Sequence, residues 1–316
     1  MAVQIVEAVI QNSMAAEAAV AWYQSRLGFV CSQQDVLDGP EFEALFQLPR
    51  NSQVKRWSLR LGREQLQIWG WPPNACAPYP EVWGGNDRWF QHICLVTDHL
   101  SNQVVGLQAD HLGVISSAPQ ILPKWNQAAA DIRAFKFKDP DGHPLELLQF
   151  PADKGDPRWH QDEQEDGRPK GFDHSAISIA DSDASLAFYR DILGFHVKGQ
   201  CMNSGIEQDQ MDGLSDTRVA ITAIGPALGP MGVEFLNYQS PLGGRDRNSP
   251  QWSDLCDRKL LLRASNLQDL HQQLQPHHAE NDCSELLALD RSLFGAVYGF
   301  TVRDPDAHGL VIVGDA

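Results

Sequence analysis

The chain has 316 residues, of which 42% are hydrophobic and 21% charged, with a formal net charge of −16 at pH 7. This length and composition are typical of a globular protein with one large or two smaller domains. The acidic balance argues against nucleic acids and anionic membranes as partners, because both require a basic protein face. The sequence contains no apolar run of about 18 residues, so no membrane-spanning helix is expected.

The N-terminus and the cysteines bear on the cellular compartment. Residues 1–7 lack the basic start and long apolar stretch of a signal peptide, and we expect them to begin the first strand. The six cysteines are scattered along the chain without a C-x-x-C pair. Reduced thiols and a cytoplasmic location are therefore expected.

The sequence repeats one pattern in its two halves. Residues 22–29 (WYQSRLGF) match residues 188–195 (FYRDILGF), 166 positions later. Residues 137–143 (FKDPDGH) match residues 302–308 (VRDPDAH), 165 positions later. Two matches so far apart with nearly the same offset indicate an internal duplication.

The duplication predicts two domains, over residues 1–150 and 172–316. Residues 151–171 are rich in charge, proline and glycine and lack apolar periodicity, so we expect them to form a linker.

Each half is predicted to contain the same order of elements twice. In the second half, a strand with alternating burial begins at 174, Asp181 is expected to cap the following helix, and Gly194 to end it. Further predicted elements are a strand at 233–238, a strand at 259–263, a helix at 267–274 and closing strands at 298–302 and 310–313. A strand, a helix and several strands thus occur four times in the chain, which predicts an α+β fold with mixed sheets.

The helix end at 188–195 and the closing hairpin at 139–148 (DPDGHPLELL) resemble those of the vicinal oxygen chelate superfamily. That group contains glyoxalase I, methylmalonyl-CoA epimerase, extradiol dioxygenases and the bleomycin- and fosfomycin-resistance proteins. The resemblance covers about the whole chain. It implies four βαβββ modules in two glyoxalase-like domains with curved mixed sheets, and metal ligands on the first and last strand of each module.

The resemblance implies metal ligands in the two middle modules. The second module offers His92 and Glu146, and the third offers His174 and Glu234. The same positions of the outer modules are occupied by Ala8, Gln67, Lys259 (or a neighbour of it) and Val311. A lone histidine or glutamate on a strand usually has a structural role, but four filled positions in adjoining modules favour a metal site.

The modules could pair in two ways. Pairing within each half, as in extradiol dioxygenases, would leave two incomplete sites. Pairing of the second module with the third, as in fused two-domain glyoxalase I proteins, would gather both histidines and both glutamates in one cup. We expect the second arrangement, because it explains why the ligands occur in pairs.

Two imidazoles and two carboxylates suit one divalent ion of Ni, Zn, Mn, Co or Fe, and leave two octahedral positions for water or substrate. The resemblance then implies a glyoxalase- or epimerase-like lyase or isomerase acting on a small oxygenated substrate through a metal-stabilised enediolate. Glu146 or Glu234 would be the catalytic group that moves the proton. Strand alternation adds Phe150, Ser178 and Tyr238 to the predicted substrate pocket.

Two alternatives remain open. A non-haem Fe(II) dioxygenase of the extradiol type would use two histidines and one glutamate, and a binding protein of the bleomycin-resistance type would need no metal. In each case the expected partner is a small molecule, and the chain is expected to be a monomer or a homodimer. His143, next to the Asp-Pro-Asp-Gly turn, is expected at the surface.

Overall fold

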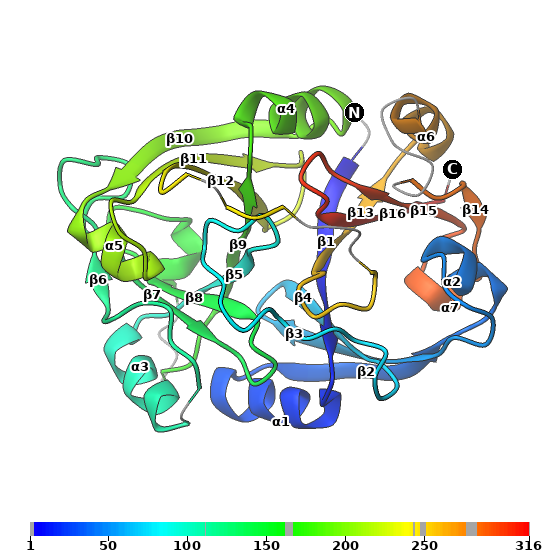
Figure 1. Cartoon of the computed structure of the whole chain (residues 1–316), viewed down its shortest axis with the longest axis horizontal. Helices are drawn as coiled ribbons and strands as arrows, with labels where there is room; N and C mark the ends of the chain where they lie inside the picture. The colour runs from blue at the N-terminus through cyan, green and yellow to red at the C-terminus, as the bar shows by residue number, and fades with distance from the viewer. Residues whose placement is uncertain are drawn as a thin grey trace.

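The computed structural model describes residues 3–110, 112–161, 167–242, 244–246, 251–275 and 283–315. Within these residues the strands form two eight-stranded sheets that lie side by side (Figure 1). None of the described helices is both long and apolar enough to cross a membrane.

One sheet, here the outer-module sheet, combines the first and fourth modules. Its strand order is β14 (Leu287–Ala288), β15 (Tyr298–Arg303), β16 (Gly309–Gly314), β13 (Lys259–Ala264), β1 (Val3–Ser13), β4 (Glu64–Gly70), β3 (Val54–Leu61) and β2 (Val30–Leu37). The β1–β13 ladder is antiparallel and joins the two modules at the centre of the sheet.

The other sheet, here the middle-module sheet, combines the second and third modules. Its strand order is β10 (His196–Ser204), β11 (Arg218–Gly225), β12 (Gly232–Ser240), β9 (Gly171–Ile179), β5 (Gln91–Val96), β8 (Pro144–Gln149), β7 (Arg133–Lys138) and β6 (Gln120–Ile121). The antiparallel β5–β9 ladder confirms the predicted pairing of the second module with the third. Each sheet takes one module from each half of the chain, so the sheets do not coincide with the two predicted domains. The boundaries at 150 and 172 therefore stay a prediction, which concerns the duplicated sequence units.

Each module contributes one helix to a core that both sheets share. These helices are α1 (Ala16–Leu27), α3 (Leu100–Ala109), α4 (Ser182–Leu186) with its continuation η2 (Ala187–Ile192), and α6 (Leu267–Leu274). Their buried faces pack with apolar residues of both sheets into a single cluster. The predicted cap is confirmed, because Asp181 accepts hydrogen bonds from two backbone amides of the first turn of α4. Gly194 adopts a φ of 81° just after the helix, as its predicted role requires.

The repeated Asp-Pro-Asp turns connect the two sheets. Tyr23 of α1 donates a hydrogen bond to Asp139 at 2.9 Å, and Tyr189 of η2 donates one to Asp304 at 3.0 Å. The ring Nε2 of His143 lies 2.7 Å from the carbonyl oxygen of Asn12, across the boundary between the sheets. His143 has no exposed surface, so the prediction that it lies at the surface is wrong.

Four shorter helices complete the described fold. They are α2 (Pro40–Leu45), η1 (Pro157–His160), α5 (Ile206–Asp212) and α7 (Arg291–Phe294). Helices α2 and α7 pack on the face of the outer-module sheet that carries Ala8, Leu261 and Val311, where their apolar residues join its core. Helix α5 contacts β10 at one edge of the middle-module sheet and β6 and β7 at the other.

Candidate metal centre

The two predicted histidine ligands lie on the two central strands of the middle-module sheet. His92 of β5 is opposite Ala176 in the β5–β9 ladder, and His174 of β9 is opposite Cys94. This diagonal register places both imidazoles on one face of the sheet, within reach of each other. Their ring centroids are 5.6 Å apart.

The two predicted glutamates come from the strands that flank this central pair. Glu146 of β8 lies beside β5, and Glu234 of β12 lies beside β9. Glu146 Oε2 is 2.9 Å from His92 Nε2 and 3.9 Å from His174 Nε2. Glu234 Oε2 is 3.4 Å from His174 Nε2. The structure therefore brings all four side chains together.

The four residues are not equivalent. His92, Glu146 and His174 offer ligand atoms that all lie within 4.8 Å of one another. Glu234 lies at the edge of this group, against His174, and its side chain is 25% exposed compared with 7% for Glu146. A tight group of two imidazoles and one carboxylate thus has a second, more accessible carboxylate beside it.

The donor atoms fit a metal ion. His92 Nδ1, His92 Nε2 and His174 Nε2 are buried and have no hydrogen-bond partner among the described residues. Although His92 Nε2 is only 2.9 Å from Glu146, the two atoms are not aligned as a hydrogen bond. Buried nitrogens without partners cost free energy, and a divalent first-row ion shared with the carboxylate would satisfy the two Nε2 atoms.

One of the histidines is oriented by a partner that was not predicted from the sequence. Asp173 Oδ2 lies 3.0 Å from His174 Nδ1, a contact that keeps a proton on Nδ1 and points Nε2 at the cluster, where it can bind a metal once its own proton is lost. Trp159 donates to the other oxygen of this carboxylate at 3.2 Å. The guanidinium of Arg158 stacks on the Trp159 ring at 3.7 Å. The predicted linker therefore contributes to the site, although the only local signal was an aspartate directly before the histidine.

The charges differ across the cluster. Burial lowers the pKa of His92 to about 4, against the opposing effect of Glu146. Burial by itself would raise the pKa of Glu146, but the nearby His92 and Lys136 outweigh it and lower this pKa to about 2. At neutral pH these two residues are therefore in the protonation states in which they bind metals.

The other pair is shifted in the opposite direction. Burial disfavours the charged form of His174, but Glu234, Asp173 and Glu146 outweigh this effect and raise its pKa to about 9. Burial raises the pKa of Glu234. In the absence of a metal, His174 is thus a cation held by the carboxylates around it.

A cavity of about 250 Å³ opens from this cluster. Among the predicted pocket residues, Phe150 lines it. Ser178 donates its hydroxyl hydrogen to the Gly85 carbonyl, and Tyr238 donates to Asp212 at 3.0 Å. Neither Ser178 nor Tyr238 is among the described residues that line the cavity.

The outer-module sheet repeats the same register with different residues. Ala8 is opposite Leu261, and Ile10 is opposite Lys259, as His92 is opposite Ala176 and Cys94 opposite His174. Val311 lies beside Leu261, and Gln67 beside Ile10. The predicted positions Ala8, Gln67, Lys259 and Val311 are therefore equivalent to the four candidate ligands, and the predicted register of Lys259 is confirmed.

Packing fills the cup of the outer-module sheet. Lys259 Nζ donates to the Asp257 carbonyl at 2.8 Å, and Gln67 accepts a hydrogen bond from the Trp69 indole at 3.1 Å. The apolar cluster at this position includes Phe42, Phe46, Trp69, Trp252 and Phe294. Aromatic side chains thus occupy the space that is a cavity in the other sheet.

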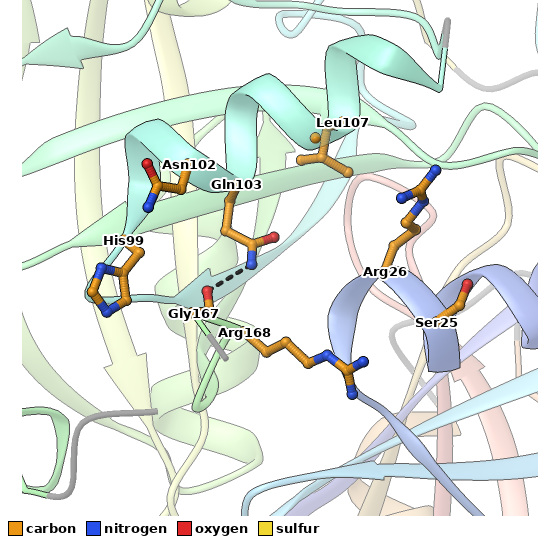
Figure 2. Close-up of a pocket in the computed structure, with 9 residues that line it drawn as sticks. Ser25, Arg26, His99, Asn102, Gln103, Leu107, Gly167 and Arg168 are labelled. Atoms are coloured by element: carbon orange, nitrogen blue, oxygen red, sulfur yellow. Dashed lines mark hydrogen bonds between the residues drawn. The ribbon is translucent and has the colours of Figure 1, made fainter. Parts of the chain in front are cut away.

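A second cavity, of about 340 Å³, lies between α1 and α3 (Figure 2). Its polar groups include Arg26, which pairs with Asp110, and Gln103, which donates to the Gly167 carbonyl at 2.6 Å. His99 is the single imidazole among its described lining residues. We therefore place the candidate site in the smaller cavity, where the ligand cluster lies.

Residues 171–312, which include His174 and Glu234, match the family model of the Glyoxalase/Bleomycin resistance protein/Dioxygenase superfamily. The match covers the third and fourth modules, in the second half of the chain. The resemblance seen in the sequence motifs is thereby confirmed. A comparison with curated protein sequences finds no match.

Two solved structures share the fold over nearly the whole chain. Glyoxalase I from Zea mays superposes with a TM-score of 0.62 at 12% identity, covering 98% of this chain and 92% of that one. A putative dioxygenase from Bacillus subtilis subsp. subtilis str. 168 superposes with a TM-score of 0.59 at 12% identity, covering 99% of this chain and 86% of that one. These likenesses show the two-domain glyoxalase-like fold, as predicted.

Proposed function

We propose that this protein is a metal-dependent lyase or isomerase, of glyoxalase or epimerase type, acting on a small oxygenated substrate. The observation that carries the proposal is the convergence of His92, Glu146, His174 and Glu234, from four adjacent strands, on one cavity. Further support comes from the glyoxalase I fold relative.

The cluster divides into ligands and a base. His92, Glu146 and His174 would hold one divalent ion of Ni, Zn, Mn, Co or Fe, because their donor atoms lie closest together. Such an ion, when bound, supplies Lewis acidity that stabilises negative charge on a substrate oxygen. Glu234 is the more accessible carboxylate, so it is the residue that takes a proton from the adjoining substrate carbon and returns it. Glu146 lies against both histidines and serves as a ligand.

A second function is favoured by the same tight group. Two imidazoles and one carboxylate with open positions are the ligand set of non-haem Fe(II) oxygenases. One of the fold relatives, from Bacillus subtilis, is described as a putative dioxygenase. In such an enzyme Glu234 would be neither a ligand nor the proton-transferring base.

Metal stoichiometry tests the shared site. The chelator-treated protein is loaded in turn with Ni, Zn, Mn, Co and Fe(II), dialysed and analysed for bound metal. One ion per chain is expected for at least one metal. His92→Ala and His174→Ala should each empty the site, because both residues bind the same ion although they lie in different halves of the chain. Retention of the ion by either variant would contradict the proposed ligand set.

Glu234→Gln separates the two activities. A panel of small α-hydroxy carbonyl compounds is incubated in D2O with the loaded protein, and exchange at the carbon next to the carbonyl is followed by ¹H NMR. For a lyase or isomerase, the variant should keep its metal and lose exchange activity by about 10²-fold or more. Oxygen uptake with catechols by the Fe(II)-loaded protein, retained in Glu234→Gln, would identify the dioxygenase instead. Failure to bind any of the metals would leave the binding-protein alternative and overturn both enzymatic functions.

A further inference from the structure

Three side chains form a polar corner: Lys136 and Gln208, which line the cavity, and Asp212, which binds both of them. Lys136 extends from β7, where it is paired with Glu146 in the ladder, and the other two are one helical turn apart on α5. Lys136 Nζ donates to one oxygen of Asp212 at 2.6 Å, and Gln208 Nε2 donates to the other at 2.7 Å. A single carboxylate thus holds both side chains in place.

The bond to Asp212 fixes the orientation of Gln208. An ionised carboxylate accepts hydrogen bonds only, so the amide NH2 must face Asp212 and the amide oxygen must point elsewhere. Gln208 is 2% exposed and lines the cavity. Its Oε1 has no hydrogen-bond partner within the described part of the chain. A buried acceptor left in this state is costly, and a ligand that brings a donor removes the cost.

Gln208 requires a donor from the ligand, whereas Lys136 requires an acceptor. Its side chain is buried and lines the same cavity. An ammonium has three N–H donors, of which the bond to Asp212 uses one. A group placed between Lys136 and Gln208 must therefore accept from the ammonium and donate to the amide oxygen. A hydroxyl does both, whereas a carboxylate or an ether oxygen only accepts and a second ammonium would be repelled.

The rest of the cavity sets the shape of the ligand. Apolar side chains of one cluster line the cavity as well: Leu122, Ala129, Ile132, Leu148, Phe150 and Met211. The volume of about 250 Å³ is below the ~300–1,000 Å³ of sites for drug-sized ligands. The occupant is thus a small molecule with an apolar body, about the size of a single ring.

We propose that the polar corner binds a hydroxyl group of the substrate, and that the substrate is a small, largely apolar hydroxylated molecule. The inference rests on the proposed function only in taking this cavity as the substrate site. It requires no metal, so metal-free protein tests it separately from the ligand cluster.

The test compares phenol with anisole, which has the same ring and oxygen but no O–H to donate. The chain has five methionines. Binding to metal-free protein labelled with ¹³C at the methionine methyl groups is followed through the Met211 signal, which is assigned from its loss in Met211→Leu. Phenol should shift this signal and bind about five- to tenfold more tightly than anisole, the value of one hydrogen bond.

Gln208→Met should abolish the preference for phenol. Gln200→Met is the matched control, because Gln200 lines the same cavity but donates to Thr222 at 3.2 Å, and it should keep the preference. Equal affinities of phenol and anisole for the wild-type protein would overturn the proposal, even if Gln208→Met fails to fold. So would an unmoved Met211 signal, or a preference that persists in Gln208→Met. Failure of the protein to bind a metal in a separate loading experiment would contradict the proposed function. It would not affect the comparison of phenol with anisole, which uses metal-free protein.

Discussion

Lys259 occupies in β13 the register position that His174 occupies in β9. Lys259 is opposite Ile10, two residues after Ala8, and His174 is opposite Cys94, two residues after His92. At one position the side chain faces a cavity and carboxylates, and at the other it is enclosed by Asp257 and aromatic rings. The duplicated positions have therefore diverged, one toward a candidate metal site and one toward a packed core.

Lys259→Met should lower stability without changing metal content. Lys259 is fully buried and its ammonium lies 3.0 Å from a carboxylate oxygen of Asp257. Removing one partner of a buried ion pair leaves the other charge buried with less compensation. Arg303 also pairs with Asp257, at 2.7 Å, so we expect a loss of about 2–4 kcal/mol in the free energy of unfolding. Urea unfolding and metal analysis check this; unaltered stability with loss of the ion would contradict it.

Asp173→Asn should weaken metal binding by about 10- to 100-fold, the usual effect of losing a carboxylate that orients a ligating histidine. The asparagine has one acceptor oxygen, whereas His174 and Trp159 each contact a separate oxygen of Asp173. Asp156→Asn is the control, since it removes the same charge from a more exposed position in the linker. Competition with a chromophoric chelator gives both affinities. An equal effect of the two variants would show that charge alone, and not orientation, is responsible.

Metal affinity should increase with pH because His174 must lose a proton to bind an ion. Burial opposes its charge, but Glu234 and the other carboxylates hold its pKa at about 9, whereas His92 has a pKa of about 4 and is already neutral. One proton is therefore released per ion below pH 9, and the apparent affinity should rise about tenfold per pH unit between pH 6 and 8. Calorimetry in two buffers of different ionisation enthalpy measures the released proton. A metal affinity that is constant between pH 6 and 8 would show that His174 is not protonated in the metal-free protein.

The two Asp-Pro-Asp turns predict opposite effects of exchanging glycine and alanine. Gly142 has a φ of 89° and Ala307, at the equivalent position, a φ of 67°. Alanine is strained in this left-handed region and glycine is not. Ala307→Gly should raise the free energy of unfolding by about 0.5–1 kcal/mol, and Gly142→Ala should lower it by about 1 kcal/mol. Urea unfolding of both variants checks the pair, and a destabilised Ala307→Gly would refute the strain.

Most of the fold followed from local sequence. The repeated motifs predicted four modules, and the helix at 267–274 is found at Leu267–Leu274. The positions of His92, Glu146, His174 and Glu234 could be read because each strand exposes its residues alternately, so the first and last strands of a module present known positions to the cup. The pairing of the middle modules followed from chemistry, since a single complete ligand set requires it.

What could not be predicted depends on contacts between distant elements. Lys136 and Asp212 are separated by 76 positions, and nothing local in either indicates that they meet. His143 follows a turn that is typical of a surface, yet its ring reaches Asn12 on the strand of another sheet. The linker was recognised by its composition, but composition does not reveal that Trp159 packs into the fold and meets Asp173. Each of these contacts forms only when the modules assemble, so a local sequence pattern does not predict it.

The exchange of modules between the two sheets has a consequence for how the site forms. Two separate half-chains would have to associate to bring His92 beside His174, and their occupancy would then depend on protein concentration. Here β5 and β9 belong to one covalent chain, so the same contact is unimolecular. The ligand cluster should therefore persist at any dilution, and a second subunit is not needed to complete it.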